Sequence, residues 1–172
     1  MDLPNRFEAH VQVEDTYRLC WSSKDDCVLR NQHLAAVGNT DLLEIEFSRL
    51  GAGVDQAIST TLAHALRLAG ADLLEVDSRQ IGVTSVRVSS GWAAQIFDNV
   101  HGGSGHVIEL AANAQEWLER TARTLFVAED HDLSCASACL RCLLTTASQF
   151  DYDCGLLSRR AAYQWLRNQL GK

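Results

Sequence analysis

Three cysteines stand within eight positions near the end of the chain, in the string Cys135-Ala-Ser-Ala-Cys139-Leu-Arg-Cys142. The two-residue gap brings Cys139 and Cys142 close enough to share one tetrahedral metal ion, and the three-residue gap brings Cys135 to the same point. Thiolates bind zinc well, and a structural zinc site is closed by four protein ligands. The spacing therefore predicts a structural Zn²⁺ site that needs one further ligand.

Two residues are candidates for the fourth ligand. Cys154 lies twelve positions after Cys142, which leaves room for a short helix and a return loop, and it is the preferred ligand. His131 lies four positions before Cys135 and is the alternative. A cluster of cysteines in a reducing compartment is better explained by metal binding than by disulfides or by burial alone.

Two catalytic metal chemistries share part of this pattern. Radical S-adenosylmethionine enzymes use the same C-x3-C-x2-C spacing, but the segment 143–172 after Cys142 is too short for their barrel. Zinc deaminases need an H-x-E…P-C-x-x-C pattern, whereas this chain has His106-Val-Ile-Glu109 and no proline before its cysteine pair. A small enzyme with an open zinc, served by Asp98, His101 and His106, stays as an alternative to a non-catalytic protein.

A glycine-rich segment joins a predicted strand to a predicted helix through Asp98, Gly102, Gly103 and Gly105. Glycine lets the backbone turn tightly and approach other elements closely. No Gly-Lys-Ser/Thr follows, so the segment is not a Walker A loop, and it lacks the last glycine of a nucleophile elbow. We interpret these four residues as a structural turn.

Three arginines near the end of the chain, Arg159, Arg160 and Arg167, are candidates for contact with DNA or with a protein partner. The formal net charge of −7 opposes non-specific binding of nucleic acid, because such binding depends on neutralising phosphates. A solvated helix face is the simpler interpretation of these charges. Direct DNA binding therefore stays an alternative function.

The elements that must position these residues are strands early in the chain and helices late in it, which predicts an α+β fold with a mostly antiparallel sheet. Alternating apolar residues indicate the strands, and apolar residues at helical spacing indicate the helices. Strands are expected at 7–13, 17–21, 42–47, 73–88 and 93–98, and helices at 54–69, 104–127, 135–148 and 157–170.

We expect one domain over 1–172, with N-terminal strands in 1–50, a sheet and helix core in 51–130 and a zinc-binding helical segment in 131–172. The N-terminus has no basic start followed by an apolar run, which argues against a signal peptide. No apolar stretch approaches the roughly 20 residues of a membrane helix. The expected location is the cytoplasm, with no membrane partner.

Several of these segments together resemble the zinc-binding domain of MrfA-type DNA-repair helicases, Hrq helicases and the DrmB protein of DISARM phage defence. The resemblance covers roughly residues 35 to 168. Its landmarks are Asn39 to Leu43, Thr61 to Leu66 with Leu73 to Val76, Phe97-Asp98 with the glycine turn, the three clustered cysteines, and Leu156 to Arg159.

Two departures from the family pattern bear on function. The first family cysteine falls at Leu133, so the resemblance implies that the fourth ligand comes from elsewhere, and Cys154 stands near a family asparagine. The chain also has no G-x-x-x-x-G-K-[ST] motif. The resemblance therefore implies a stand-alone, non-catalytic zinc protein that partners a separate DNA helicase, or another defence-complex subunit, in bacterial repair or antiphage defence.

Overall fold

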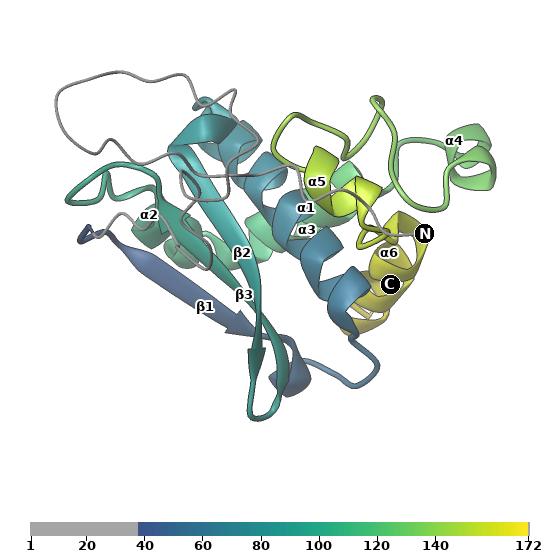
Figure 1. Cartoon of the computed structure of the whole chain (residues 1–172), viewed down its shortest axis with the longest axis horizontal. Coiled ribbons are helices and arrows are strands. Elements are labelled where there is room, and N and C mark those ends of the chain that lie inside the picture. The colour runs from purple at the N-terminus through teal and green to yellow at the C-terminus, as the bar shows by residue number, and fades with distance from the viewer. Residues whose placement is uncertain (1–37, 172) are drawn as a thin grey trace, which may run out of the picture. The chain divides into compact units, whose positions relative to one another are not determined.

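Within residues 38–171, the sheet has three antiparallel strands in the order β1-β3-β2, with bounds Leu42–Glu46 for β1, Ile81–Val88 for β2 and Gly91–Asp98 for β3. The computed structural model describes residues 38–171 (Figure 1). Leu43 lies opposite Ile96 in the central strand, and Val83 lies opposite Ile96 on the other side. The α+β class predicted from the sequence is confirmed.

Helix α1, Gln56–Leu74, packs against β2 and β3 and contacts the later helices α3 and α6. It begins at Asp55, whose side chain accepts a hydrogen bond from the Ile58 amide at 2.8 Å, as an N-cap does. Leu62 and Leu66 on this helix are almost fully buried. Trp117 donates its indole N–H to the Leu66 carbonyl at 2.8 Å, which ties α3 to α1.

The sequence predicted that the first helix ends at Gly70, but α1 continues to Leu74. A Cβ at Gly70 would lie 2.9 Å from Leu110 and 3.1 Å from Trp117, so glycine here permits close helix packing. The helix ends instead at Glu75, which adopts the left-handed conformation with φ of 55°. The strand expected from residue 73 therefore starts only at β2, after a 3-10 turn η3 at Ser78–Gln80.

The single long helix expected over 104–127 is two helices, α2 at His106–Ala112 and α3 at Ala114–Leu125. They are separated at Asn113, which has φ of −109° and ψ of 30°. The helix expected over 135–148 is a series of turns between α4, Glu129–Ser134, and α5, Gln149–Asp153. The last helix, α6, covers Arg159–Gln169, and a short 3-10 turn η2 covers Phe47–Arg49.

The described residues 38–171 lie in one compact unit with a common core. The strands predicted at 7–13 and 17–21 lie outside the described residues, so the single domain over 1–172 stays a prediction. Within the described part of the chain, no helix has both the length and the apolar character to cross a membrane.

Candidate metal centre

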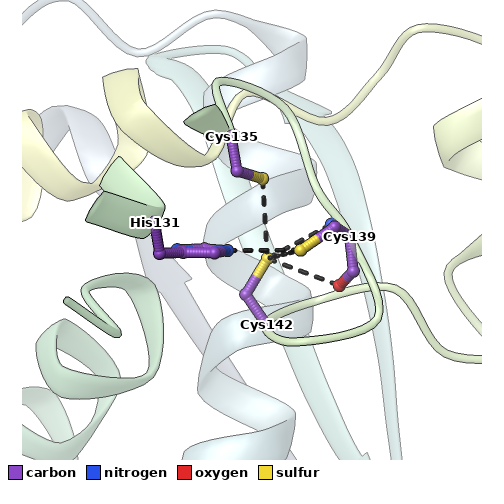
Figure 2. A group of neighbouring side chains, drawn as sticks. All are labelled: His131, Cys135, Cys139 and Cys142. Atoms are coloured by element: carbon purple, nitrogen blue, oxygen red, sulfur yellow. Dashed lines mark hydrogen bonds between the residues drawn. The ribbon is translucent and has the colours of Figure 1, made fainter. Parts of the chain in front are cut away.

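His131, Cys135, Cys139 and Cys142 converge on one point, with one donor atom from each lying within 4.8 Å of the others. Figure 2 shows the imidazole of His131 and the three thiols turned toward a common centre. His131 Nε2 lies 3.2 Å from Cys139 Sγ. The structure therefore brings the three predicted cysteines together with the alternative fourth ligand.

The separations between these donors fit a tetrahedral zinc ion. Zn–S bonds of about 2.3 Å place two thiolates about 3.8 Å apart on a tetrahedron. The Sγ atoms of Cys139 and Cys142 are 3.8 Å apart, and those of Cys135 and Cys142 are 3.9 Å apart. Three sulfurs and one nitrogen form a ligand set that zinc uses in structural sites.

The local chain path explains how the four donors meet. His131 lies on α4, and Cys135 is the residue at which that helix ends. The chain then turns so that the amides of Cys142 and Leu144 both donate to the Cys139 carbonyl, at 3.0 and 3.1 Å. The Cys139 amide donates to Cys142 Sγ at 3.2 Å. This tight turn holds two of the sulfurs together.

The environment of the thiols favours ionisation at one of them. Burial raises the pKa of Cys139, but hydrogen bonds from His131, the Arg141 amide and the neighbouring thiols bring that pKa down to about 7. Burial raises the pKa of Cys142 to about 11, although hydrogen bonds from the amides of Cys139 and Leu143 act to lower it. A bound cation favours the thiolate form of every coordinating cysteine.

Cys154 does not join this group, although the sequence analysis preferred it as the fourth ligand. It is exposed and stands at the end of α5, and the group within 4.8 Å contains His131 instead. His131 is buried, whereas Leu133, where the resemblance placed the family cysteine, is 83% exposed. The structure thus favours His131, which α4 presents from two positions before Leu133.

Arg159 is completely buried and therefore cannot offer its guanidinium to DNA or to a partner in this structure. Its Nε donates to the Cys135 carbonyl at 3.0 Å, and its Nη1 donates to the Leu125 carbonyl at 2.6 Å. Its Nη2 pairs with Asp132 Oδ1 at 2.8 Å. The first residue of α6 thus joins the end of α3 to the metal-binding turn.

The other two arginines have different surroundings. Arg160 donates to the backbone carbonyl of Asp132, on α4, and lies near the carboxylate of the same residue. Arg167 is exposed, and its guanidinium carbon lies 5.9 Å from the centre of the Tyr163 ring. The three residues therefore do not form one exposed basic surface.

Asp98 organises the glycine turn through its carboxylate. Oδ2 accepts from the Ser104 amide at 2.7 Å, and Oδ1 accepts from the Val107 amide at 3.1 Å. Gly102, Gly103 and Gly105 all have φ between 78° and 90°, which favours glycine. Burial raises the pKa of Asp98, but the amide hydrogen bonds outweigh it and hold that pKa below its ordinary value.

The acid–base residues proposed for an open zinc are not part of the metal group. Within the described residues the group holds neither Asp98 nor His101 nor His106. His106 Nε2 lies 3.0 Å from Gln80 Oε1, and His101 is exposed. Asp132, the ion-pair partner of Arg159, was not predicted from the sequence, where only its position beside His131 pointed to it.

Comparison with known proteins supports the resemblance to the MrfA-type zinc-binding domain. Residues 62–143 match the family model described as the MrfA Zn-binding domain, which confirms the recognition made from the sequence over that segment. With the His/Cys group, this match identifies Zn²⁺ as the cofactor. No curated protein matches the chain.

A solved structure titled "Crystal Structure of DUF1998 helicase MrfA bound to DNA" also aligns with the chain, at 15% sequence identity and a TM-score of 0.49. The alignment covers 69% of this chain. It covers only 15% of the helicase chain, so this protein spans a small part of that helicase's length.

Proposed function

Starting from the MrfA Zn-binding domain at residues 62–143, we propose that this protein is a non-catalytic, zinc-stabilised accessory protein of a DNA helicase. Its setting would be bacterial DNA repair or antiphage defence. The proposal that the zinc is not catalytic is supported by its set of four protein donors: His131, Cys135, Cys139 and Cys142. Four protein donors complete a tetrahedron and leave no position for a reactive water.

In this proposal zinc stabilises the fold of the C-terminal part of the chain. The segment from Cys135 to Cys142 has turns but no helix or strand, so it lacks a regular hydrogen-bond ladder of its own. Binding to a metal site that the unfolded chain lacks adds directly to folding free energy. Arg159 then connects the turn to α3 and α6, so the metal supports the placement of these helices as well.

The zinc-held turn also presents apolar side chains that a partner protein can bind. Leu140 lies between Cys139 and Cys142 in the sequence and is 87% exposed, and Leu133 on α4 is 83% exposed. Single exposed apolar residues are common on proteins, but a partner that buries two such leucines on one metal-held segment gains their transfer free energy. We therefore assign the contact with the helicase to this turn.

The experiment is a tagged pull-down of the zinc-loaded protein from its native host, followed by mass spectrometry. We expect a DNA helicase at a near-equal amount, and we expect Leu140→Ser to lose it while keeping its zinc. Ile108→Ser is the matched control, because Ile108 is a 63% exposed apolar residue on α2. Zinc-loaded wild-type protein that retains no helicase would contradict the proposal.

A further inference from the structure

A second surface, on the helices that follow the sheet, has the features of a peptide-binding groove. It lies between α3 and α6 and has a volume of about 440 Å³. Clefts that bind ligands or side chains usually measure about 300–1,000 Å³. Its apolar lining is provided by Ala122 and Phe126 on one side and by Tyr163 and Leu170 on the other. None of these residues belongs to the metal centre.

The groove is built on a rigid aromatic pair. The rings of Phe126 and Tyr163 stack with centroids 5.1 Å apart and an angle of 24° between their planes. The ends of the two helices are held by Arg159, which donates to the Leu125 carbonyl next to Phe126. Aromatic residues fixed in this way are common at the centres of protein interfaces, because ordering them on binding costs little entropy.

Two arginines stand beside the apolar lining, one from each helix. Arg123 on α3 has a 72% exposed side chain and forms a 3.7 Å ion pair with Glu119, a 30% exposed residue that also lines the groove. Arg167 on α6 lies over Tyr163, and no ion pair joins it to a carboxylate within residues 38–171. The lining thus carries two guanidinium groups and one carboxylate, so the groove has a local excess of positive charge in a chain whose net charge is −7, and this excess attracts carboxylates.

We propose that this groove binds an acidic peptide segment of a protein partner, with an aromatic or leucine side chain in the groove and carboxylates on Arg123 and Arg167. Single-stranded nucleic acid fits less well for two reasons. The overall negative charge opposes a phosphate backbone, and Tyr163, the ring on which a base would stack, already contacts both Phe126 and Arg167.

The test is a selection of random peptides displayed on phage against the immobilised, zinc-loaded full chain. The selected peptide is then synthesised with a fluorescent label, and its affinity is measured by anisotropy. We expect the enriched peptides to combine an aromatic or leucine residue with neighbouring Asp or Glu. The double variant Arg123→Glu/Arg167→Glu should bind such a peptide at least about tenfold more weakly.

The matched control is Arg49→Glu/Arg79→Glu, which changes the net charge equally at two exposed arginines outside the groove. We expect this control to bind with unchanged affinity, and both variants to keep their zinc. Peptides without acidic residues, or equal binding by the two double variants, would overturn the proposal. Arginine-dependent binding of a dT15 oligonucleotide, or a wild-type dimer that the groove variant abolishes, would assign the groove to DNA or to a second copy instead.

Discussion

The guanidinium of Arg159 donates a hydrogen bond to the backbone carbonyl of Cys135, 3.0 Å away and 24 positions earlier in the chain. Cys135 is a member of the metal-binding group, and Arg159 is the first residue of α6. The backbones of the two segments are joined as well, because the Arg159 amide donates to the carbonyl of Ser137, two positions after Cys135, at 3.0 Å. The metal centre and the last helix therefore form one connected unit.

Replacing Arg159 with alanine should destabilise the fold strongly. The change leaves the carbonyls of Leu125 and Cys135 without their donor and removes the ion pair with Asp132. Loss of one member of a buried charged network costs about 3 kcal/mol or more of unfolding free energy. Urea unfolding measures this, with the exposed Arg167→Ala as a control that should stay within about 0.5 kcal/mol of wild type.

The glycine turn permits a comparison of two neighbouring glycines. Gly102 and Gly103 have φ of 90° and 78°, so an alanine at either position is strained by about 1 kcal/mol. Only at Gly103 would the new Cβ collide with Asp41, at 2.4 Å from Oδ2 and 3.3 Å from the backbone amide, whereas nothing lies within 4 Å at Gly102. We expect Gly103→Ala to lower the midpoint of thermal unfolding more than Gly102→Ala. Equal midpoints would show that Asp41 moves aside freely.

Asp98 should make stability depend on pH in the acidic range. Its pKa is lowered in the folded state, where its carboxylate accepts amide hydrogen bonds. The stabilisation is present above the unfolded pKa of about 3.9 and is lost as the pH falls through the lower folded pKa. Asp98→Asn should therefore be less stable than wild type by about 1 kcal/mol at pH 7. In urea titrations this difference should shrink below pH 4; a difference that is constant down to pH 3 would contradict the assignment.

Removing zinc should loosen one part of the molecule before the rest. A chelator should abolish protection from hydrogen exchange in the segment 129–160, because this segment has short helices and turns held by the metal and by Arg159. Helix α1 and the sheet, which share the main core, should keep their protection. Simultaneous loss of protection in β3 would show instead that zinc supports the whole fold.

The features that followed from local sequence were predicted well. The alternating residues of β1 and the helical periodicity of α1 indicated these elements, a strand was also expected where β3 lies, and the cysteine spacing indicated the metal. The helix expected over the cysteines was wrong: Ala and Leu have high helix propensity, but the segment from Cys135 to Cys142 forms turns that bring its three thiols together. Tertiary geometry overrode propensity at this point.

The features that sequence reasoning missed depend on long-range contacts. Arg159 looked like a surface charge because its buried acceptors, the carbonyls of Leu125 and Cys135, carry no side-chain signal. Gly70 looked like a helix end because its packing against Leu110 and Trp117 is visible only in three dimensions. Cys154 was preferred to His131 because the twelve positions after Cys142 leave room for a return loop, whereas the donor group within 4.8 Å contains His131, which α4 presents.

The most direct test of the ligand assignment is a measurement of zinc retention against a colorimetric chelator in four proteins. Wild type and Cys154→Ser should hold zinc equally, since Cys154 is exposed and outside the group. His131→Ala and Cys139→Ser should release zinc at chelator concentrations that wild type withstands. If Cys154→Ser released its zinc readily while His131→Ala held it like wild type, the proposed ligand set would be wrong.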